Sequence, residues 1–117
     1  MFLFTNFVLT MRQLYMMVLL IIFCIFGTDA RAQNDFEYLY NKGVVLYNKG
    51  DTNEALKYFL KASTVNPNEP ITHYQIGFAY LALGNNQEAT RYFEQFIKLE
   101  PNGAKTETAR AILSSLK

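Results

Sequence analysis

The chain has 117 residues, of which 50% are apolar and 15% aromatic, and its formal net charge is +1 at pH 7. This length allows one small domain, and the balanced charge argues against a nucleic-acid partner, because phosphates require a basic patch. The only cysteine is Cys24, which excludes an intramolecular disulfide and a multi-cysteine metal site.

The N-terminal region has the pattern of an export signal. Residues 14–26 form an unbroken apolar run that follows Arg12. A basic start, an apolar stretch of about 7–15 residues and small residues before the cut site are typical of a secretory signal peptide. Ala30 and Ala32 supply the small residues. We therefore predict a signal peptide over residues 1–32 that is cleaved after Ala32.

The start of this signal and its fate allow alternatives. Residues 1–10 carry no charge, so we expect Met11 rather than Met1 to be the initiator. A membrane-spanning helix requires about 20 apolar residues, and residues 14–26 are short for a retained anchor, which is the alternative to cleavage. Cys24 follows a bulky residue, which argues against its lipidation. Cleavage predicts a periplasmic or secreted protein without a thiol.

Residues 36–67 and 70–101 are two copies of one pattern at an offset of 34 residues. A fixed period of this size indicates stacked supersecondary units. The identical pairs are Tyr40/Tyr74, Gly43/Gly77, Gly50/Gly84, Glu54/Glu88, Ala55/Ala89, Tyr58/Tyr92, Phe59/Phe93 and Pro67/Pro101.

Each copy predicts a helix, a tight turn, a second helix and a stop. Gly50 and Gly84 are expected to end the first helices in the left-handed conformation. Asp51 and Asn85 follow at once, each with a glutamate three residues later, which predicts N-capping boxes. Proline ends each copy because it cannot continue a helix. The expected helices cover residues 35–48, 52–65, 70–82 and 86–99.

Two further glycines lie inside the first helices, where glycine costs about 1 kcal/mol relative to alanine. Gly43 and Gly77 therefore predict a close helix–helix approach, with Ala55 and Ala89 as the small facing partners and the phenylalanines filling the core. The predicted repeat-defining residues are Gly43, Gly50, Ala55, Phe59, Pro67, Gly77, Gly84, Ala89, Phe93 and Pro101.

The last segment, residues 104–117, has one apolar stripe at helical spacing. We expect it to form a capping helix over the open end of the stack. The stripe consists of Ala109, Ile112, Leu113 and Leu116.

These residues together resemble the tetratricopeptide repeat (TPR) family, which they match over nearly all of the chain after Ala32. The resemblance implies an all-α fold, a short right-handed α-solenoid of antiparallel helix pairs, with repeats over residues 33–69 and 70–103. The matching positions are Gly43, Gly50, Ala55, Phe59, Ala62 and Pro67 in the first copy and Gly77, Tyr80, Gly84, Ala89, Phe93 and Pro101 in the second. The sequence departs from the family at Leu39 and His73, where a large aromatic is usual, and at Phe96, which replaces the small Ala62.

A second apolar stripe on the first helices is the candidate binding surface. In the TPR family this stripe lines a concave groove that receives a partner peptide, so the resemblance implies a protein–protein interaction module. The alternatives are that a second copy covers the stripe or that it packs within the solenoid. The candidate groove residues are Tyr40, Val44, Tyr47, Asn48, Ile71, Tyr74, Gln75, Phe78 and Leu81. None is cationic, which argues against the carboxylate clamp of some family members.

The sequence carries no motif of an enzyme or of a cofactor site. It has no Ser/His/Asp grouping, no His-rich metal spacing and no Gly-rich phosphate loop. The single histidine, His73, takes a core-facing position in the repeat. We therefore expect no catalytic residue, no metal and no cofactor, and a protein partner instead.

Overall fold

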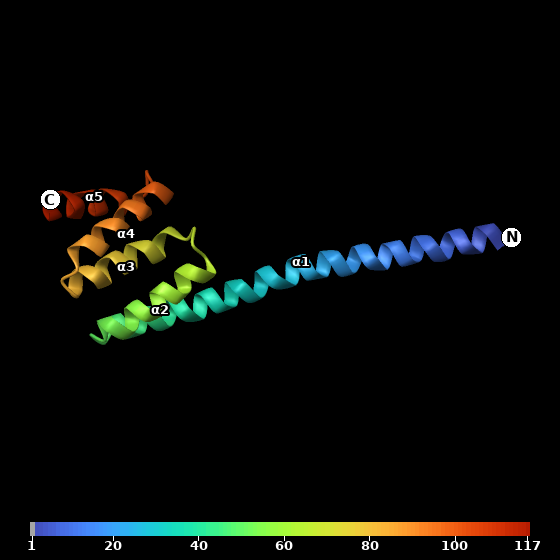
Figure 1. Cartoon of the computed structure of the whole chain (residues 1–117), viewed down its shortest axis with the longest axis horizontal. Coiled ribbons are helices and arrows are strands. Elements are labelled where there is room, and N and C mark those ends of the chain that lie inside the picture. The colour runs from blue at the N-terminus through green and yellow to red at the C-terminus, as the bar shows by residue number, and fades with distance from the viewer. Residues whose placement is uncertain (1) are drawn as a thin grey trace. The chain divides into compact units, whose positions relative to one another are not determined.

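The structure is a computed structural model, and it describes residues 2–117. Met1, one of the two candidate initiators, lies outside the described residues. Within this range all regular secondary structure is helical, which confirms the predicted all-α class (Figure 1). The helices are α1 (Phe2–Asn48), α2 (Thr52–Val65), α3 (Pro70–Ala82), α4 (Asn86–Leu99) and α5 (Thr106–Leu116).

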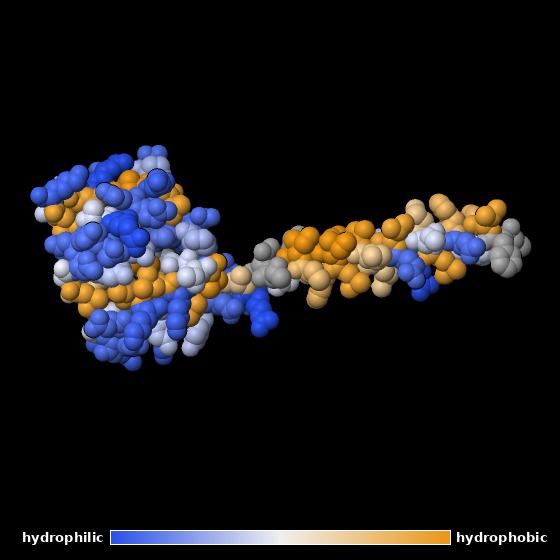
Figure 2. Space-filling model, viewed as in Figure 1, coloured by the Kyte–Doolittle hydropathy of each residue, from blue (hydrophilic) through white to orange (hydrophobic). Residues whose placement is uncertain are grey.

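The chain divides after Gln33 into an N-terminal unit and a repeat unit that runs from Asn34 to Lys117. The N-terminal unit is the first part of α1, and the large apolar side chains that the structure describes in it, from Leu3 to Ile25, are exposed (Figure 2). By length and composition α1 could cross a membrane, and none of its apolar window is buried, although a signal sequence passes the same test. Both fates of this segment therefore stay open.

The expected start of the first helix, residue 35, is wrong, because α1 is continuous from Phe2. The upstream residues include no proline and a single glycine, Gly27, so nothing in the local sequence stops a helix there. The other predicted helices agree with the structure in both bounds, since α2, α3 and α4 begin and end at the predicted residues. The capping segment is slightly shorter than expected.

The turns within the repeats follow the glycine prediction. Gly50 and Gly84 have φ angles of 90° and 77°, the left-handed conformation that a side chain disfavours. The main-chain N–H groups that follow them donate back to carbonyls of the preceding helix, as in a Schellman-type end. This confirms both C-caps.

Of the two predicted capping boxes, the second forms its N-cap half only, since the Glu88 side chain pairs with Arg91 and the Asn85 N–H donates to the Tyr80 carbonyl. Asn85 accepts a hydrogen bond from the Glu88 N–H at 3.2 Å, whereas Asp51 makes no side-chain cap. The prediction at Asp51 is therefore wrong. The Glu54 side chain instead pairs with Lys57 one turn later, at 2.5 Å, an exposed ion pair of small energetic value.

The helix-stopping role of the prolines is confirmed. Helix α2 ends at Val65, two residues before Pro67, and α4 ends at Leu99, two residues before Pro101. Pro70 is the first residue of α3, a position where a missing N–H costs nothing.

The glycines inside the first helices lie against the phenylalanine rings of the second helices. A Cβ on Gly43 would lie 2.7 Å from the ring of Phe59, and a Cβ on Gly77 would lie 2.9 Å from the ring of Phe93. Both rings are fully buried, as are Ala55 and Ala89. The predicted close approach is therefore made to the phenylalanine rings, and the predicted pairing of the glycines with the alanines stays a prediction. Burying such a ring contributes about 1.5–3 kcal/mol, more than the roughly 1 kcal/mol that glycine costs in a helix.

The core contains two clusters, one between α2 and α3 and one between α4 and α5. The first joins Ala55, Leu56 and Phe59 of α2 to Ile76 and Ala79 of α3. The second joins α4 to α5 and consists of Ala89, Phe93, Phe96 and Ala109, with Ile112 and Leu113 packed against it. Adjacent helices thus cover one another in chain order, as in an α-solenoid, and α5 covers the end formed by α4.

Candidate functional site

One stripe of residues along α1 and α3, separate from the candidate groove residues, is turned towards the core. Gly43, His73, Ile76 and Gly77 are buried, while Leu39, Leu46 and Tyr80 are partly buried. This stripe packs against the second helices. The neighbouring stripe on α1 and α3, which holds the candidate groove residues, can therefore contact a partner.

In the first repeat the apolar candidate groove residues are half-buried. Tyr40, Val44 and Tyr47 pack against the first core cluster, and the Tyr40 ring centroid lies 5.8 Å from that of Phe59. Gln75 donates a long hydrogen bond of 3.5 Å to the Tyr40 hydroxyl, so the two repeats are linked across this surface. Each ring thus has one side in the core.

In the second repeat the aromatic packing is denser. The Tyr74 ring lies 4.9 Å from Phe96, and the Phe78 ring meets Phe93 edge-on at 5.2 Å. Tyr74 and Phe78 also contact each other in a T-shaped pair at 4.9 Å. These geometries are the favoured ones for aromatic pairs. The rings belong to the repeat's own packing, yet both stay partly exposed.

The remaining candidate residues lie around these rings. Asn48 is the last residue of α1 and is exposed, which leaves its amide available for a partner. Ile71 and Leu81 are half-buried near the two ends of α3, and Leu81 packs against the second core cluster. The structure therefore gathers apolar side chains and amide groups from α1 and α3.

One residue beside the candidate groove was missed by the sequence analysis. Lys105 lies directly before α5, and its Nζ is 5.4 Å from the centroid of the Tyr74 ring, a cation–π geometry. It falls outside both aligned copies. One further step of 34 residues aligns Lys105 with Ile71, a candidate groove residue, and this alignment would have indicated that Lys105 lies beside the groove. The surface therefore has a cation at the α5 side.

His73 has a structural role in this arrangement. Its Nε2 lies 2.7 Å from the Pro67 carbonyl oxygen, which can only accept, so Nε2 carries the proton and donates. The ring stacks on Tyr92 at 5.9 Å and is 7% exposed. Its Nδ1 is buried and, among the described residues, has no hydrogen-bond partner. His73 thereby fastens the loop between the repeats to α3.

The titratable groups nearby give no sign of a reactive cluster. Burial raises the pKa of the Tyr92 hydroxyl above its usual value, and the Arg91 guanidinium beside it opposes this shift only in part. Arg91 itself pairs with Glu88 at 2.7 Å. Within residues 2–117 no group of three metal-binding side chains is close enough to hold an ion.

Comparisons with known proteins follow the repeat pattern. A family model described as regulator of microtubule dynamics protein 1-3 matches residues 46–117. An uncharacterised protein of Methanocaldococcus jannaschii is 39% identical over 64 residues, which cover 55% of this chain and 74% of that protein.

Two named relatives contain tetratricopeptide repeats. A tetratricopeptide repeat and J domain-containing co-chaperone of Fusarium oxysporum f. sp. lycopersici is 34% identical over 84 residues, 70% of this chain and 16% of that protein. Tetratricopeptide repeat protein 17 of Mus musculus is 35% identical over 75 residues, 64% of this chain and 6% of that protein. The likeness to these two proteins is thus confined to a small part of each.

Proposed function

This chain belongs to the family described as regulator of microtubule dynamics protein 1-3, and on this premise we propose that its repeat unit binds a peptide or helix of a partner protein. The named relatives carry tetratricopeptide repeats, and stacked helical repeats form extended surfaces of the kind that receive a peptide or helix. We extend this role to the present chain as a scaffold or assembly factor built from two repeats and a capping helix.

The observation that carries the proposal is the row of half-buried apolar side chains along α1 and α3. Tyr40, Tyr47, Tyr74 and Phe78 each pack one side against the core and keep part of the ring exposed. Such side chains are already ordered, so a partner that covers them gains apolar burial with little loss of side-chain entropy. Tyrosine suits this role because its hydroxyl can stay hydrated while the ring is covered.

The polar groups around this surface define the partner's chemistry. The side-chain amide of Asn48 is exposed, while the side-chain amide of Gln75 donates to the Tyr40 hydroxyl. Amides at these places can bond the main chain of an extended or helical peptide. We expect apolar side chains of the partner to provide most of the affinity and the amides to fix its register.

The test compares tyrosines on two faces of the first repeat. Tyr47→Ala removes a groove ring, whereas Tyr58→Ala removes a half-buried ring on α2, beside Lys61. Proteins captured by the full chain from its native host are identified by mass spectrometry, and the affinity of the main partner is then measured for each variant. We expect Tyr47→Ala to weaken binding about tenfold, or about 1.4 kcal/mol, and Tyr58→Ala to leave it unchanged. Equal affinities of both variants would refute the groove.

Export is a separate part of the proposal. The exposed apolar side chains of the N-terminal unit suit either a signal sequence or a membrane helix, and the small residues Ala30 and Ala32 favour cleavage after Ala32. The protein would then act in the periplasm or outside the cell. The intact mass of the protein from its host decides between the two fates: loss of residues through Ala32 supports export, and retention of α1 supports a membrane-tethered subunit.

A further inference from the structure

The loop between α4 and α5 contains the only Asn-Gly pair in the sequence, Asn102–Gly103. Asn102 is exposed, and residues 101–105 form turns and a bend rather than a helix. We propose that Asn102 is a site of spontaneous deamidation, and that the reaction loosens the attachment of the capping helix α5.

The glycine in this pair lies beside the Glu100 side chain. A Cβ at Gly103 would come within 2.5 and 2.7 Å of Cδ and Cγ of Glu100, an exposed side chain that can turn away. Without a Cβ, the main-chain nitrogen of Gly103 is open to approach. Among the described residues, no oxygen accepts a hydrogen bond from its N–H.

The chemistry needs only water. The Gly103 main-chain nitrogen gives up its proton to solvent base and attacks Cγ of Asn102, so that a new N–Cγ bond closes a succinimide ring. The Cγ–Nδ2 bond breaks, and the NH2 group takes a proton back from solvent and leaves as ammonia. Water then opens the ring at the Cγ carbonyl to give an aspartate, or at the main-chain carbonyl of residue 102 to give an isoaspartate. The net change replaces an amide by a carboxylate and involves no oxidation or reduction.

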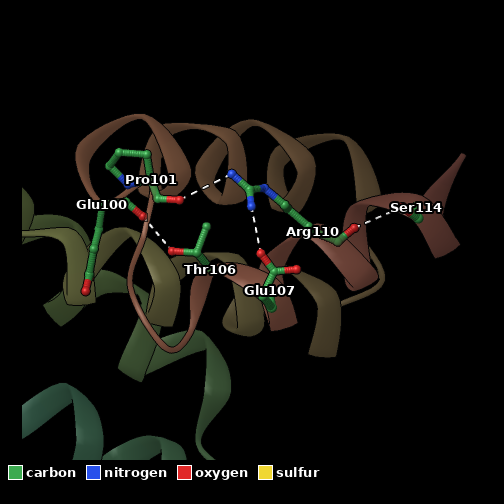
Figure 3. A network of polar contacts seen from close by, with 6 residues as sticks. All are labelled: Glu100, Pro101, Thr106, Glu107, Arg110 and Ser114. Atoms are coloured by element: carbon green, nitrogen blue, oxygen red, sulfur yellow. Dashed lines mark hydrogen bonds and ion pairs between the residues drawn. The ribbon is translucent and has the colours of Figure 1, made fainter.

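The loop is fastened on both sides of this site. Thr106 Oγ1 donates to the Glu100 carbonyl at 2.5 Å, and Arg110 Nη2 donates to the Pro101 carbonyl at 3.2 Å (Figure 3). On the other side the Thr106 N–H donates to the Gly103 carbonyl at 3.1 Å. These bonds set the distance between the end of α4 and the start of α5.

Isoaspartate formation would disturb this distance directly. It inserts a methylene group into the main chain between two of the anchored carbonyls and places a new negative charge near Glu100. Helix α5 supplies Ala109 to the second core cluster, where it packs with Phe93 and Phe96. A misplaced start of α5 therefore exposes the apolar end of the stack.

The first repeat provides a matched internal control. Asn68 occupies the equivalent position, one residue after Pro67, and is also exposed. It is followed by Glu69, whose side chain hinders the approach of the main-chain nitrogen and whose N–H donates to the Asn66 carbonyl at 3.4 Å. The two loops thus present the same residue after the same proline with different neighbours.

The experiment ages the full chain in mildly alkaline buffer and follows both asparagines by peptide mass spectrometry with isoaspartate detection. We expect Asn102 to convert at least about tenfold faster than Asn68, because only glycine leaves the attacking nitrogen unhindered. Conversion of Asn102 at the same rate as Asn68, or no conversion, would overturn the proposal.

Two variants sharpen the result. Glu69→Gly transplants the pair into the first repeat and should make Asn68 reactive, whereas Asn102→Gln should abolish conversion in the second. Amide hydrogen exchange then tests the structural consequence. Exchange in α5 should rise in the aged wild-type chain and not in the aged Asn102→Gln variant. Equal exchange in both would show that the modification leaves α5 in place.

Discussion

The two repeats share the residues that fix the distance between their own helices and differ at those that meet the next element. Both place a glycine against a buried phenylalanine ring, Gly43 on Phe59 and Gly77 on Phe93. Helix α2 then presents the small Ala62, whereas α4 presents Phe96, which is fully buried beside α5. The contact between the two helices of a repeat is therefore the same in both copies. The outer face of the second helix differs between them, because a different element packs against it.

The largest expected effect comes from removing the shared ring. Phe59→Ala and Phe93→Ala should each lower the free energy of unfolding by about 3–5 kcal/mol, because they leave a cavity opposite a glycine that cannot fill it. Urea denaturation followed by circular dichroism measures both. A loss below about 1 kcal/mol at either site would contradict the packing described here.

Filling the glycine position should harm each repeat by a smaller amount. Gly43→Ala and Gly77→Ala gain about 1 kcal/mol of helix propensity but force the Cβ into an aromatic ring, an overpacking that costs about 1–3 kcal/mol. We expect a net loss at both positions, measured by thermal unfolding.

The two repeats differ in how the N-terminus of the second helix is capped. Asn85 caps α4 with its side chain and Asp51 does not cap α2. Asn85→Ala should therefore cost about 1 kcal/mol of stability, and Asp51→Ala should cost clearly less. Chemical denaturation of the two variants gives the comparison directly. Equal losses would mean that Asp51 does cap its helix in solution.

The smallest effect concerns pH. Burial raises the pKa of the Tyr92 hydroxyl in the folded state. Above about pH 10 the unfolded chain therefore loses the hydroxyl proton at a lower pH than the folded chain does. The corresponding stability is present below that pH and is lost as the pH rises towards the folded-state pKa. Tyr92→Phe should flatten the alkaline fall in unfolding free energy more than Tyr58→Phe does. A fall that is unchanged in Tyr92→Phe would exclude this contribution.

The sequence predicted the helix ends of the repeat unit because local chemistry determines them. Gly50 and Gly84 allow the left-handed conformation, and Pro67, Pro70 and Pro101 limit where a helix can run. The start of α1 was not predictable in the same way, since the residues before Asn34 contain no strong helix breaker. Among the candidate groove residues, the sequence indicated which side chains share a face but not how far each is buried.

The amino-acid sequence by itself determined the period, the helix ends and the all-α fold, because these depend on caps, breakers and apolar spacing within a few residues. Tertiary structure alone decided that the rings of Phe59 and Phe93 lie against the two glycines, since three-dimensional packing selects which of several apolar neighbours comes closest. It likewise brought Lys105 to the Tyr74 ring and Glu100 to Gly103. Such contacts depend on how one helix is placed against the next, and no local pattern encodes that placement.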